Sequence, residues 1–394
     1  MKAFRLFLPC ALFPLLGFAA DPQLPGVAAA IQKAIAAREI TGAVTLVVTK
    51  DQMLDRESIG LADVASGRAM TSDALFNIMS MTKPITATAI LMLQDDGKLR
   101  VTDPVAKFIP AFAALKTPSG QPANLTIAQL MTHTSGLGEG AGDAMRTAHT
   151  LADLMPIFLA AKMQYEPGAQ WKYTQSGLNT AARIVEVASG QSFPEFLNAR
   201  LFGPLGMKDT THTPTQAQVP RIATPYAKNK ETGALEAGRV NPPAPGERPT
   251  TGNAGLYASG PDYARFCQML LNGGTLDGHR YLSPEAMKLL TTVQTGELPT
   301  GFFQTEIFGK RGLNYGWGIG TCILKTPHDG VPAMLSPGTY GHGGAWGTQA
   351  WIDPVKGVAY VLMVQRSNFP TAMQARSVAT SSRRPSTRSR GVEH

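Results

Sequence analysis

The chain has 394 residues, of which 43% are hydrophobic and 16% are charged. Because an average globular chain has about 25% charged residues, this composition favours a large buried core and excludes a disordered protein. The formal net charge of +8 at pH 7 is concentrated at the two ends: Lys2 and Arg5 lie near the start, and residues 376–394 contain five arginines and one glutamate. The sequence between them is close to neutral, so neither a nucleic-acid partner nor a basic surface across the domain is expected.

The first twenty residues have the pattern of a signal peptide. Lys2 and Arg5 precede an almost wholly apolar run over residues 6–18, and Ala19 and Ala20 supply small residues for cleavage. The apolar run is shorter than the roughly 20 residues that a stable membrane helix needs. We therefore expect an exported protein, periplasmic or secreted, with no stable membrane span in its mature form.

The predicted elements begin with an amphipathic helix over residues 27–37. Two β-rich runs on either side of the polar turn Lys50-Asp51-Gln52 then predict a hairpin, with strands over 43–49 and 54–60. In the middle of the chain, two helical patterns end at a glycine, as helices often do, and cover residues 83–96 and 176–189. Strand patterns return at residues 315–324, 347–353 and 357–365.

Strands near both ends with helices between them predict an α/β (α+β) fold. One antiparallel sheet would be built from both chain ends and flanked by helices, with a mostly helical region inserted. We expect a single domain over residues 21–375. Residues 376–394 are rich in serine and arginine and have no apolar period, so they are expected to form a disordered tail.

Several kinds of site lack support in the sequence. The seven histidines show no metal-ligand spacing and there is no Cys-x-x-Cys pair, so neither a metal nor an organic cofactor is expected. A Gly-rich phosphate loop and a Gly-x-Ser-x-Gly motif are both missing. After residue 20 the only cysteines are Cys267 and Cys322; free buried thiols are favoured, and a disulfide between them stays open.

One short motif can carry chemistry. Ser80-Met81-Thr82-Lys83 lies at the start of a strongly apolar helical pattern, and one helical turn separates the serine hydroxyl from the lysine amine. A neutral lysine within hydrogen-bond reach can take the serine proton and so make a nucleophile without histidine. Such a lysine must lose its charge through burial or a neighbouring cation. Because Ser-x-x-Lys also arises by chance, the motif needs support from the rest of the chain.

That support comes from a resemblance. Residues 76–84, Phe-Asn-Ile-Met-Ser-Met-Thr-Lys-Pro, closely resemble the first active-site motif of the serine β-lactamase and penicillin-binding protein superfamily, to which class C β-lactamases are related. Further segments are similar to later motifs of that superfamily, in the same order: 97–99, 103–105, 125–127, 133–137, 166–173, 204–207, 255–263 and 341–347. The resemblance spans roughly residues 25–368, and a β-lactamase/transpeptidase-like fold is what it implies.

The resemblance also implies roles for residues in the first two motifs. Ser80 would be the acylated nucleophile and Lys83 its partner. Tyr173 would take the nucleophile's proton and return a proton to the leaving group. The family often has asparagine two positions after this tyrosine, where this chain has Gln175, so the reach of its amide is open. In the family's recurrent loop, His133 is expected to be structural and to bond within that loop, and residues 136–144 could form a mobile rim.

In the third motif, the chain departs from the β-lactamase pattern Lys-Thr/Ser-Gly and has His342-Gly343-Gly344. The backbone N–H groups of Ser80 and Ala345 would form the oxyanion hole. His342 is expected to be mostly neutral at pH 7, so recognition of a substrate carboxylate should be weak. Trp346 either walls the acyl pocket or packs on the sheet.

Many family VIII carboxylesterases lack the lysine of the third motif, and the sequence looks more like them, although some related peptidases carry histidine there. We therefore expect an exported serine hydrolase that acts on a small ester or β-lactam-like substrate, and a carboxylesterase is the function that the sequence favours. A β-lactamase or D-Ala-D-Ala carboxypeptidase is the first alternative. A penicillin-binding or sensor protein that is acylated without turnover is the second, and nucleic-acid binding through the tail is a distant third. The oligomeric state is open.

Overall fold

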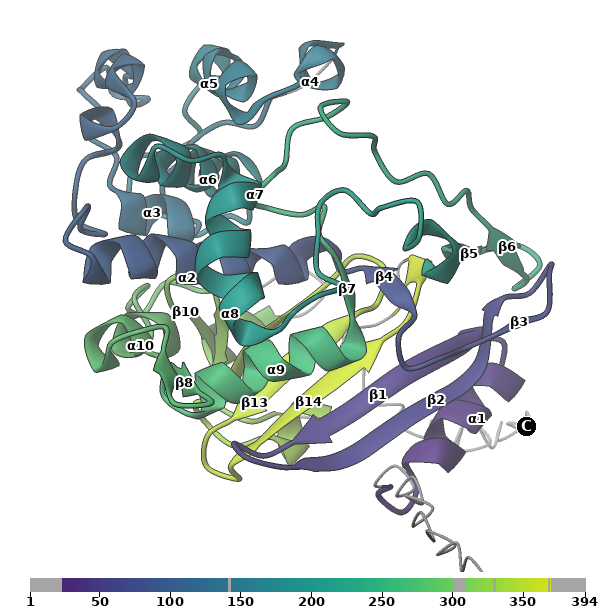
Figure 1. The fold of residues 1–394 in the computed structure, drawn as a ribbon. Helices are drawn as coiled ribbons and strands as arrows, with labels where there is room; N and C mark the ends of the chain where they lie inside the picture. The colour runs from purple at the N-terminus through teal and green to yellow at the C-terminus, as the bar shows by residue number, and fades with distance from the viewer. Residues whose placement is uncertain (1–22, 141–142, 301–308, 329–330, 368, 370–394) are drawn as a thin grey trace, which may run out of the picture.

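The computed structural model describes residues 23–140, 143–300, 309–328, 331–367 and 369. The expected signal peptide (1–20) and C-terminal tail (376–394) lie outside the described residues. Elements from the two ends of the described chain share one large sheet, and the middle of the chain forms a helical region that lies above this sheet in Figure 1.

The large sheet has eight strands in the order β10-β11-β12-β13-β14-β1-β2-β3, and all neighbours in it are antiparallel. Its strands are β1 (Gly42–Val48), β2 (Met53–Asp63), β3 (Arg68–Ala69), β10 (Tyr315–Trp317), β11 (Cys322–Leu324), β12 (Tyr340–Gly343), β13 (Gln349–Asp353) and β14 (Val358–Met363). Smaller sheets pair β4 (Leu75–Asn77) with β7 (Tyr257–Ser259), β8 (Thr275–Leu276) with β9 (His279–Arg280), and β5 (Tyr226–Lys228) with both β6 (Leu235–Ala237) and β15 (Arg366–Ser367).

The centre of the sheet joins the two ends of the chain. Strand β1 pairs with β2 on one side, through the expected hairpin, and with β14 on the other, where Val44 faces Met363. The alternation of β1 places Val44 and Leu46 in the main core and Ala43 in a smaller cluster on the opposite face. The expectation of an antiparallel sheet built from both chain ends is confirmed.

Helices cover both faces of this sheet. Helix α1 (Val27–Ala36) packs on one face, where Ile31 and Ile35 join the small cluster around Ala43. Helix α9 (Gly260–Leu271) packs on the other face, in front of the sheet in Figure 1. A Cβ atom at Gly260 would lie 2.6 Å from Leu46 Cδ1, so glycine lets the start of α9 approach β1 closely.

The helical region includes short and long helices. They are α2 (Thr82–Asp95), α3 (Ile127–Met131), α4 (Asp143–Thr147), α5 (Leu151–Ala160), α6 (Ser176–Ser189), α7 (Phe193–Leu197) and α8 (Gly203–Leu205), and α10 (Pro284–Thr291) follows α9. Helix α6 matches the expected range, and α2 differs from it by one residue at each end. Gly97 and Gly190 follow these two helices with φ of 70° and 73°, which glycine adopts without strain.

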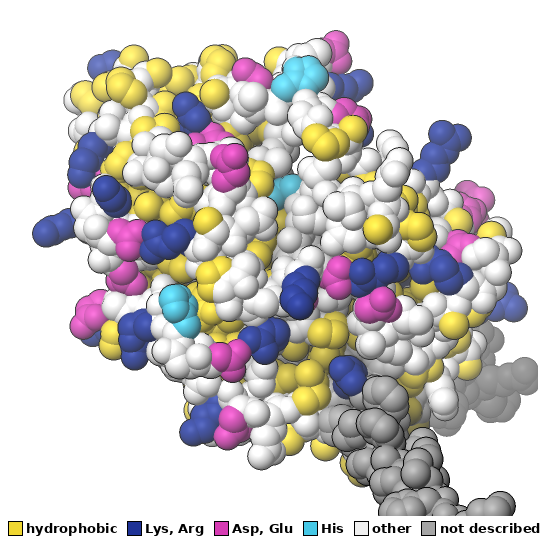
Figure 2. All heavy atoms as spheres, in the orientation of Figure 1, with side chains coloured by type: hydrophobic (Ala, Val, Ile, Leu, Met, Phe, Trp, Pro, Cys, Tyr) yellow, Lys and Arg dark blue, Asp and Glu magenta, His cyan; other side chains and the backbone are white. Residues whose placement is uncertain are grey.

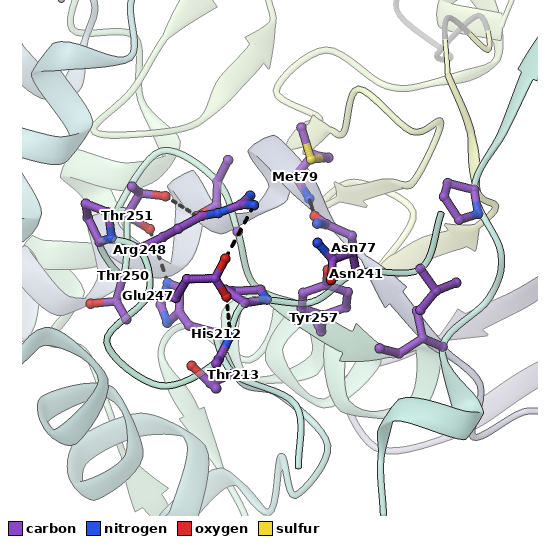
Figure 3. A pocket seen from close by; sticks show the side chains of 18 of the residues that line it. Asn77, Met79, His212, Thr213, Asn241, Glu247, Arg248, Thr250, Thr251 and Tyr257 are labelled. Atoms are coloured by element: carbon purple, nitrogen blue, oxygen red, sulfur yellow. Dashed lines mark hydrogen bonds and ion pairs between the residues drawn. The ribbon is translucent and has the colours of Figure 1, made fainter. Parts of the chain in front are cut away.

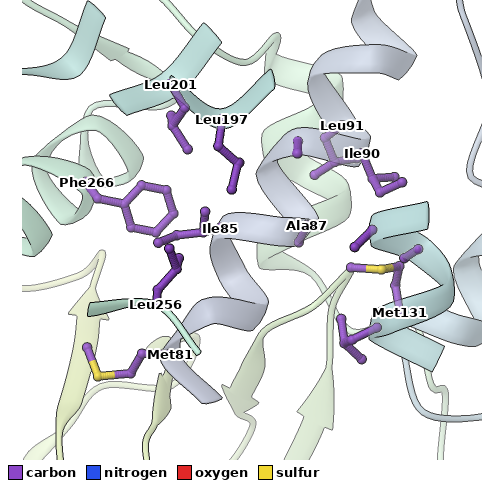
Figure 4. Close-up of a cluster of buried hydrophobic side chains, with 14 of the residues drawn as sticks. Met81, Ile85, Ala87, Ile90, Leu91, Met131, Leu197, Leu201, Leu256 and Phe266 are labelled. Atoms are coloured by element: carbon purple, nitrogen blue, oxygen red, sulfur yellow. The ribbon is translucent and has the colours of Figure 1, made fainter. Parts of the chain in front are cut away.

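Helix α2 is the centre of the core. Every residue from Thr82 to Leu93 is buried, so this helix has no solvent face over that stretch. Figure 4 shows its apolar side chains among residues of other elements, including Leu256, Phe266 and Met131. Burying one Ile or Leu side chain contributes about 1.5–3 kcal/mol. The only charged residue type in this buried stretch is Lys83, so its position needs a functional explanation.

One strand prediction needs correction. Residues 315–324 form two strands, β10 and β11, joined by a tight turn in which Gly318 N–H donates to the Thr321 carbonyl at 2.9 Å. Gly320 has φ of 73°, and a Cβ at Gly318 would lie 2.2 Å from the Leu290 carbonyl. A nearly continuous apolar run concealed this turn, because both strands and the residues between them are buried.

The surface shows no cationic face in the view of Figure 2, where lysine and arginine side chains alternate with acidic ones. Among the described residues, no helix is both long and apolar enough to cross a membrane. Cys267 and Cys322 are both buried, and both are free thiols.

Candidate active site

Ser80 lies in a single 3₁₀ turn, η1 (Met79–Met81), between strand β4 and helix α2. Met79 has φ of 47°, a left-handed conformation that costs a non-glycine residue on the order of 1 kcal/mol. The Asn77 side chain supports this turn, because its Oδ1 accepts a hydrogen bond from Met79 N–H at 3.1 Å. The turn leaves Ser80 half-buried at the start of α2, where the helix dipole favours negative charge.

Lys83 is fully buried one turn further along and faces three oxygen atoms. Its Nζ lies 3.1 Å from Ser80 Oγ, 3.0 Å from Gln175 Oε1 and 2.8 Å from the carbonyl oxygen of Asn253. Asn253 Nδ2 also donates to Gln175 Oε1 at 2.8 Å and so turns that oxygen toward the amine. The expected pairing of Ser80 with Lys83 is present, and the amide of Gln175 does reach the lysine.

Burial lowers the pKa of Lys83 well below its ordinary value, and the Glu139 carboxylate opposes this shift. A neutral amine has two N–H groups and one lone pair. The oxygens of Gln175 and Asn253 can only accept, so they take the two N–H groups. The lone pair is then left for the Ser80 hydroxyl, and the amine can act as a base.

The Tyr173 ring lies over this amine, with Nζ 4.7 Å from the ring centroid. The Tyr173 hydroxyl is 3.5 Å from His342 Nε2. Burial raises the pKa of Tyr173 above its ordinary value, although a hydrogen bond with Ser80 opposes the rise. The phenol is therefore protonated at neutral pH and is a proton donor in the resting site.

His342 lies in β12 with only 1% of its surface exposed, and it faces Tyr173 rather than solvent. Its Nδ1 lies 2.6 Å from the Gly343 carbonyl oxygen, which can only accept, so Nδ1 carries the proton and Nε2 is the acceptor for Tyr173. Burial, with a smaller effect of nearby Lys83, lowers the pKa of His342 to about 3. The ring is neutral at pH 7, in agreement with the expectation from the sequence.

The glycines of the third motif bring β12 close to the nucleophile's turn. A Cβ at Gly344 would lie 2.5 Å from the Ile78 carbonyl oxygen and 2.2 Å from Thr348 Oγ1, so only glycine fits. Gly344 N–H donates to the Thr348 carbonyl at 2.7 Å and is not free for substrate. Ala345 follows it and is exposed.

Trp346 lines a cavity of about 990 Å³ beside the nucleophile. The cavity wall also includes Met79 and Ala254, the neighbours of Ser80 and Asn253 in sequence. Figure 3 shows Met79 on one side of this cavity and Arg248, from the segment before Asn253, on the other. The cavity reaches the sequence neighbours of the nucleophile, and its volume is sufficient for a bulky substituent.

His133 is buried and positions the second motif. The sequence predicts a hydrogen bond within its own loop, but its Nδ1 accepts from the Thr174 N–H at 3.2 Å, next to Tyr173. Its ring lies 4.5 Å from the Tyr173 ring, centroid to centroid. Burial, followed by the nearby Lys83 and His342, lowers the pKa of His133 well below its ordinary value, so the neutral form of the ring next to Tyr173 is favoured.

Two residues of the site were missed in the sequence. Asn253 supplies the carbonyl that holds Lys83, and Glu139 accepts hydrogen bonds from the backbone N–H groups of Gln175 and Ser176. A buried lysine needs acceptors, but nothing in the local sequence says which distant residue provides them. Among the described residues, no group of three or more His, Cys, Asp or Glu side chains is arranged to hold a metal ion.

The expected rim over residues 136–144 is fixed at its start. A Cβ at Gly136 would lie 2.2 Å from the Tyr165 carbonyl oxygen, and one at Gly138 would lie 2.6 Å from that of Lys162. Gly136 also has φ of 71°. These close contacts place residues 136–138 against residues 161–165, and Glu139 follows them next to the second motif.

Comparison with known proteins agrees with this geometry. The chain matches the Beta-lactamase family over residues 27–381 and belongs to that family of serine hydrolases. It is 32% identical over 368 residues to Protein Rv1367c of Mycobacterium tuberculosis, a match that covers 87% of this chain and 90% of that protein. It is 29% identical over 368 residues to esterase EstB of Burkholderia gladioli, covering 85% of this chain and 88% of the esterase.

Solved structures share the fold. EstCE1, described as a hydrolase with promiscuous acyltransferase activity, superposes with a TM-score of 0.75 over 88% of this chain and 96% of its own. Its sequence identity of 21% makes this a likeness of fold. The superfamily and the fold class inferred from the sequence motifs are both confirmed.

Proposed function

We propose that the protein is an exported carboxylesterase that hydrolyses small esters through an acyl-enzyme on Ser80. The observation that carries this proposal is the position of Lys83, a buried amine whose two N–H groups are taken by carbonyl oxygens while Ser80 Oγ lies 3.1 Å away. Desolvation keeps such an amine neutral, and a neutral amine is the base that a serine nucleophile needs.

Acylation begins when the Ser80 hydroxyl gives its proton to Lys83 and Oγ attacks the ester carbonyl carbon. The resulting oxyanion is stabilised by the backbone N–H groups of Ser80 and Ala345, which flank the point where β12 meets the nucleophile's turn. When the tetrahedral intermediate collapses, the leaving alcohol oxygen takes a proton from Tyr173, and Tyr173 regains one from the Lys83 ammonium. The products are the alcohol and the Ser80 ester.

Deacylation follows the same path in reverse, with water in place of the alcohol. Water gives a proton to Lys83 as its oxygen attacks the Ser80 ester carbonyl. The departing Ser80 Oγ takes a proton through Tyr173, which releases the carboxylic acid and restores the resting site. This assignment makes Lys83 the base and Tyr173 the proton donor, because burial keeps Tyr173 protonated.

Esters are favoured over β-lactams and peptide C-termini because of His342. Those substrates carry a carboxylate that a cation of the third motif would pair with, whereas burial keeps His342 neutral and its Nε2 faces Tyr173. The similarity to esterase EstB supports the same choice. Export is part of the proposal and rests on the signal-like residues 1–20.

The test is parallel turnover of p-nitrophenyl butyrate and a chromogenic cephalosporin by the purified protein, beside the Ser80→Ala variant. We expect serine-dependent turnover of the ester and slow or no cleavage of the cephalosporin. Fast cephalosporin cleavage would make the protein a β-lactamase instead. A stoichiometric adduct on Ser80 without turnover would make it a penicillin-binding or sensor protein.

A further inference from the structure

Glu139 places a charged group beside the proton-transfer residues. It follows Gly136 and Gly138, whose close packing against residues 161–165 fixes the path of the backbone. Its two carboxylate oxygens accept from different backbone groups: Oε1 from Gln175 N–H, and Oε2 from Ser176 N–H at 3.1 Å. Gln175 is the residue whose side-chain oxygen holds Lys83 Nζ.

A helix dipole and two backbone N–H groups oppose the effect of desolvation on this carboxylate. Helix α6 has 14 residues and begins at Ser176, so Glu139 lies at the positive end of its dipole. Partial desolvation raises the pKa of Glu139, whereas the two N–H donors oppose this rise. The side chain is nevertheless exposed, and its charge acts on both Lys83 and Tyr173.

Lys83 and Lys172 are the cations that influence this carboxylate, and neither forms an ion pair with it. Burial favours the neutral forms of Lys83, His133 and His342. Lys172 lowers the pKa of the carboxylate through its charge, and its Nζ donates to Gln164 Oε1 at 2.5 Å rather than to Glu139. In the described part of the chain, Glu139 forms no ion pair within 4.0 Å.

We propose that Glu139 is a specificity-determining residue whose negative charge disfavours esters with an anionic group close to the reacting bond and favours neutral and cationic esters. This inference rests on the proposed ester hydrolysis and narrows its substrate class. It also adds a second cause for poor β-lactam cleavage, independent of His342. A substrate carboxylate brought near Ser80 has no cation to pair with at His342 and is also repelled by Glu139. The repulsion acts through space, so mobile ions must weaken it.

The experiment uses three p-nitrophenyl esters of matched chain length: the neutral pentanoate, the anionic monoester of adipic acid and the cationic 5-(trimethylammonio)pentanoate. For the wild-type protein, kcat/KM should be lowest for the anionic ester.

Glu139→Gln keeps one oxygen to accept an N–H and removes the charge, so it should raise the anionic-to-neutral ratio of kcat/KM roughly ten-fold. Glu139→Asp, which retains the negative charge, should keep the wild-type order of kcat/KM. Added salt should raise the ratio for the wild type and leave Glu139→Gln nearly unchanged.

Glu195→Gln is the matched control, because Glu195 also caps a helix, accepting from Ser192 N–H at 3.0 Å at the start of α7. It should leave the ratio unchanged. If Glu139→Gln slows the hydrolysis of all three esters equally, the inference is overturned, because this is the result expected if Glu139 only caps helix α6. If Glu139→Gln does not fold, a wild-type ratio that is insensitive to salt overturns it equally. Failure of the wild type to hydrolyse the neutral ester, with no difference from Ser80→Ala, would overturn the proposed function and this inference together.

Discussion

The Tyr173 hydroxyl and His342 Nε2 lie 3.5 Å apart, and the second nitrogen of the same imidazole, Nδ1, donates to the Gly343 carbonyl oxygen. The third motif of this chain therefore contacts the proton-transfer residue of the second motif. A neutral imidazole that accepts from Tyr173 keeps the phenol protonated and aimed at the site. It supplies no positive charge to a substrate carboxylate.

Replacing His342 with lysine tests this arrangement. His342→Lys should raise activity on a carboxylate-bearing cephalosporin relative to p-nitrophenyl butyrate, because an ammonium group can pair with the carboxylate. The measurement is the ratio of kcat/KM for the two substrates. His342→Gln, which is neutral, is the control and should not raise the ratio. An unchanged ratio in a folded His342→Lys protein would contradict the interpretation of this position.

Ser80→Ala and Lys83→Ala should each lower kcat by about three orders of magnitude or more, because the two residues act as a unit. Steady-state hydrolysis of p-nitrophenyl butyrate measures the loss, and circular dichroism checks the fold. The double variant should lose little more than either single variant. Near-native turnover by folded Ser80→Ala protein would exclude the acyl-enzyme mechanism.

The pH profile should report Lys83. Because only the neutral amine can act as a base, kcat/KM should rise as pH increases through the lowered pKa of Lys83 and then level off. Gln175→Glu would put a carboxylate 3.0 Å from Nζ in place of a neutral oxygen and favour the ammonium form. The acid limb should therefore move to higher pH. An acid limb at the wild-type position would mean that another group controls it.

Buried histidines should make the fold sensitive to acid. The pKa of His342 is lowered to about 3 and that of His212 to about 4, in both cases mainly by burial, against an ordinary value of 6.5. As pH falls below 6.5, the unfolded chain binds protons at these rings before the folded chain does, so stability is lost. The loss is at most about 3 kcal/mol for each ring by pH 4.

Urea unfolding at pH 7.5 and pH 4.5 measures this effect. The stability difference between the two conditions should be smaller for His212→Gln than for the wild type. His279→Gln, at an exposed position, is the control and should behave as the wild type. Equal losses in all three proteins would show that other groups determine the acid sensitivity.

The part of the site that lies in local sequence motifs could be predicted from the sequence. Ser80 and Lys83 are three residues apart, so one helical turn determines their proximity. Helix α6 could be predicted in full because a polar start and Gly190 mark both of its ends. The family motifs then identified Tyr173 and His342, which lie 169 residues apart and meet only in the fold.

The contacts made to the site by residues that are distant in sequence could not be predicted. Asn253 reaches Lys83 across 170 residues through a backbone carbonyl, a group that every residue possesses. Glu139 reaches Gln175 across 36 residues from a glycine-rich segment whose composition is typical of a mobile loop. Its path is fixed by contacts of Gly136 and Gly138 with residues 161–165, and such packing leaves no periodic pattern in a sequence.

The pairing of β1 with β14 also determines when the protein can fold. Strand β1 ends at Val48, whereas its partner begins at Val358, so one edge of the central strand stays unpaired until the segment around Val358 has left the ribosome. Pairing between such distant segments makes folding slow. A nascent chain that stays unfolded for so long suits the proposed export, because translocation through a narrow channel requires an extended polypeptide. Chaperone binding before release is therefore expected to matter more for this protein than for one whose central strands are neighbours in sequence.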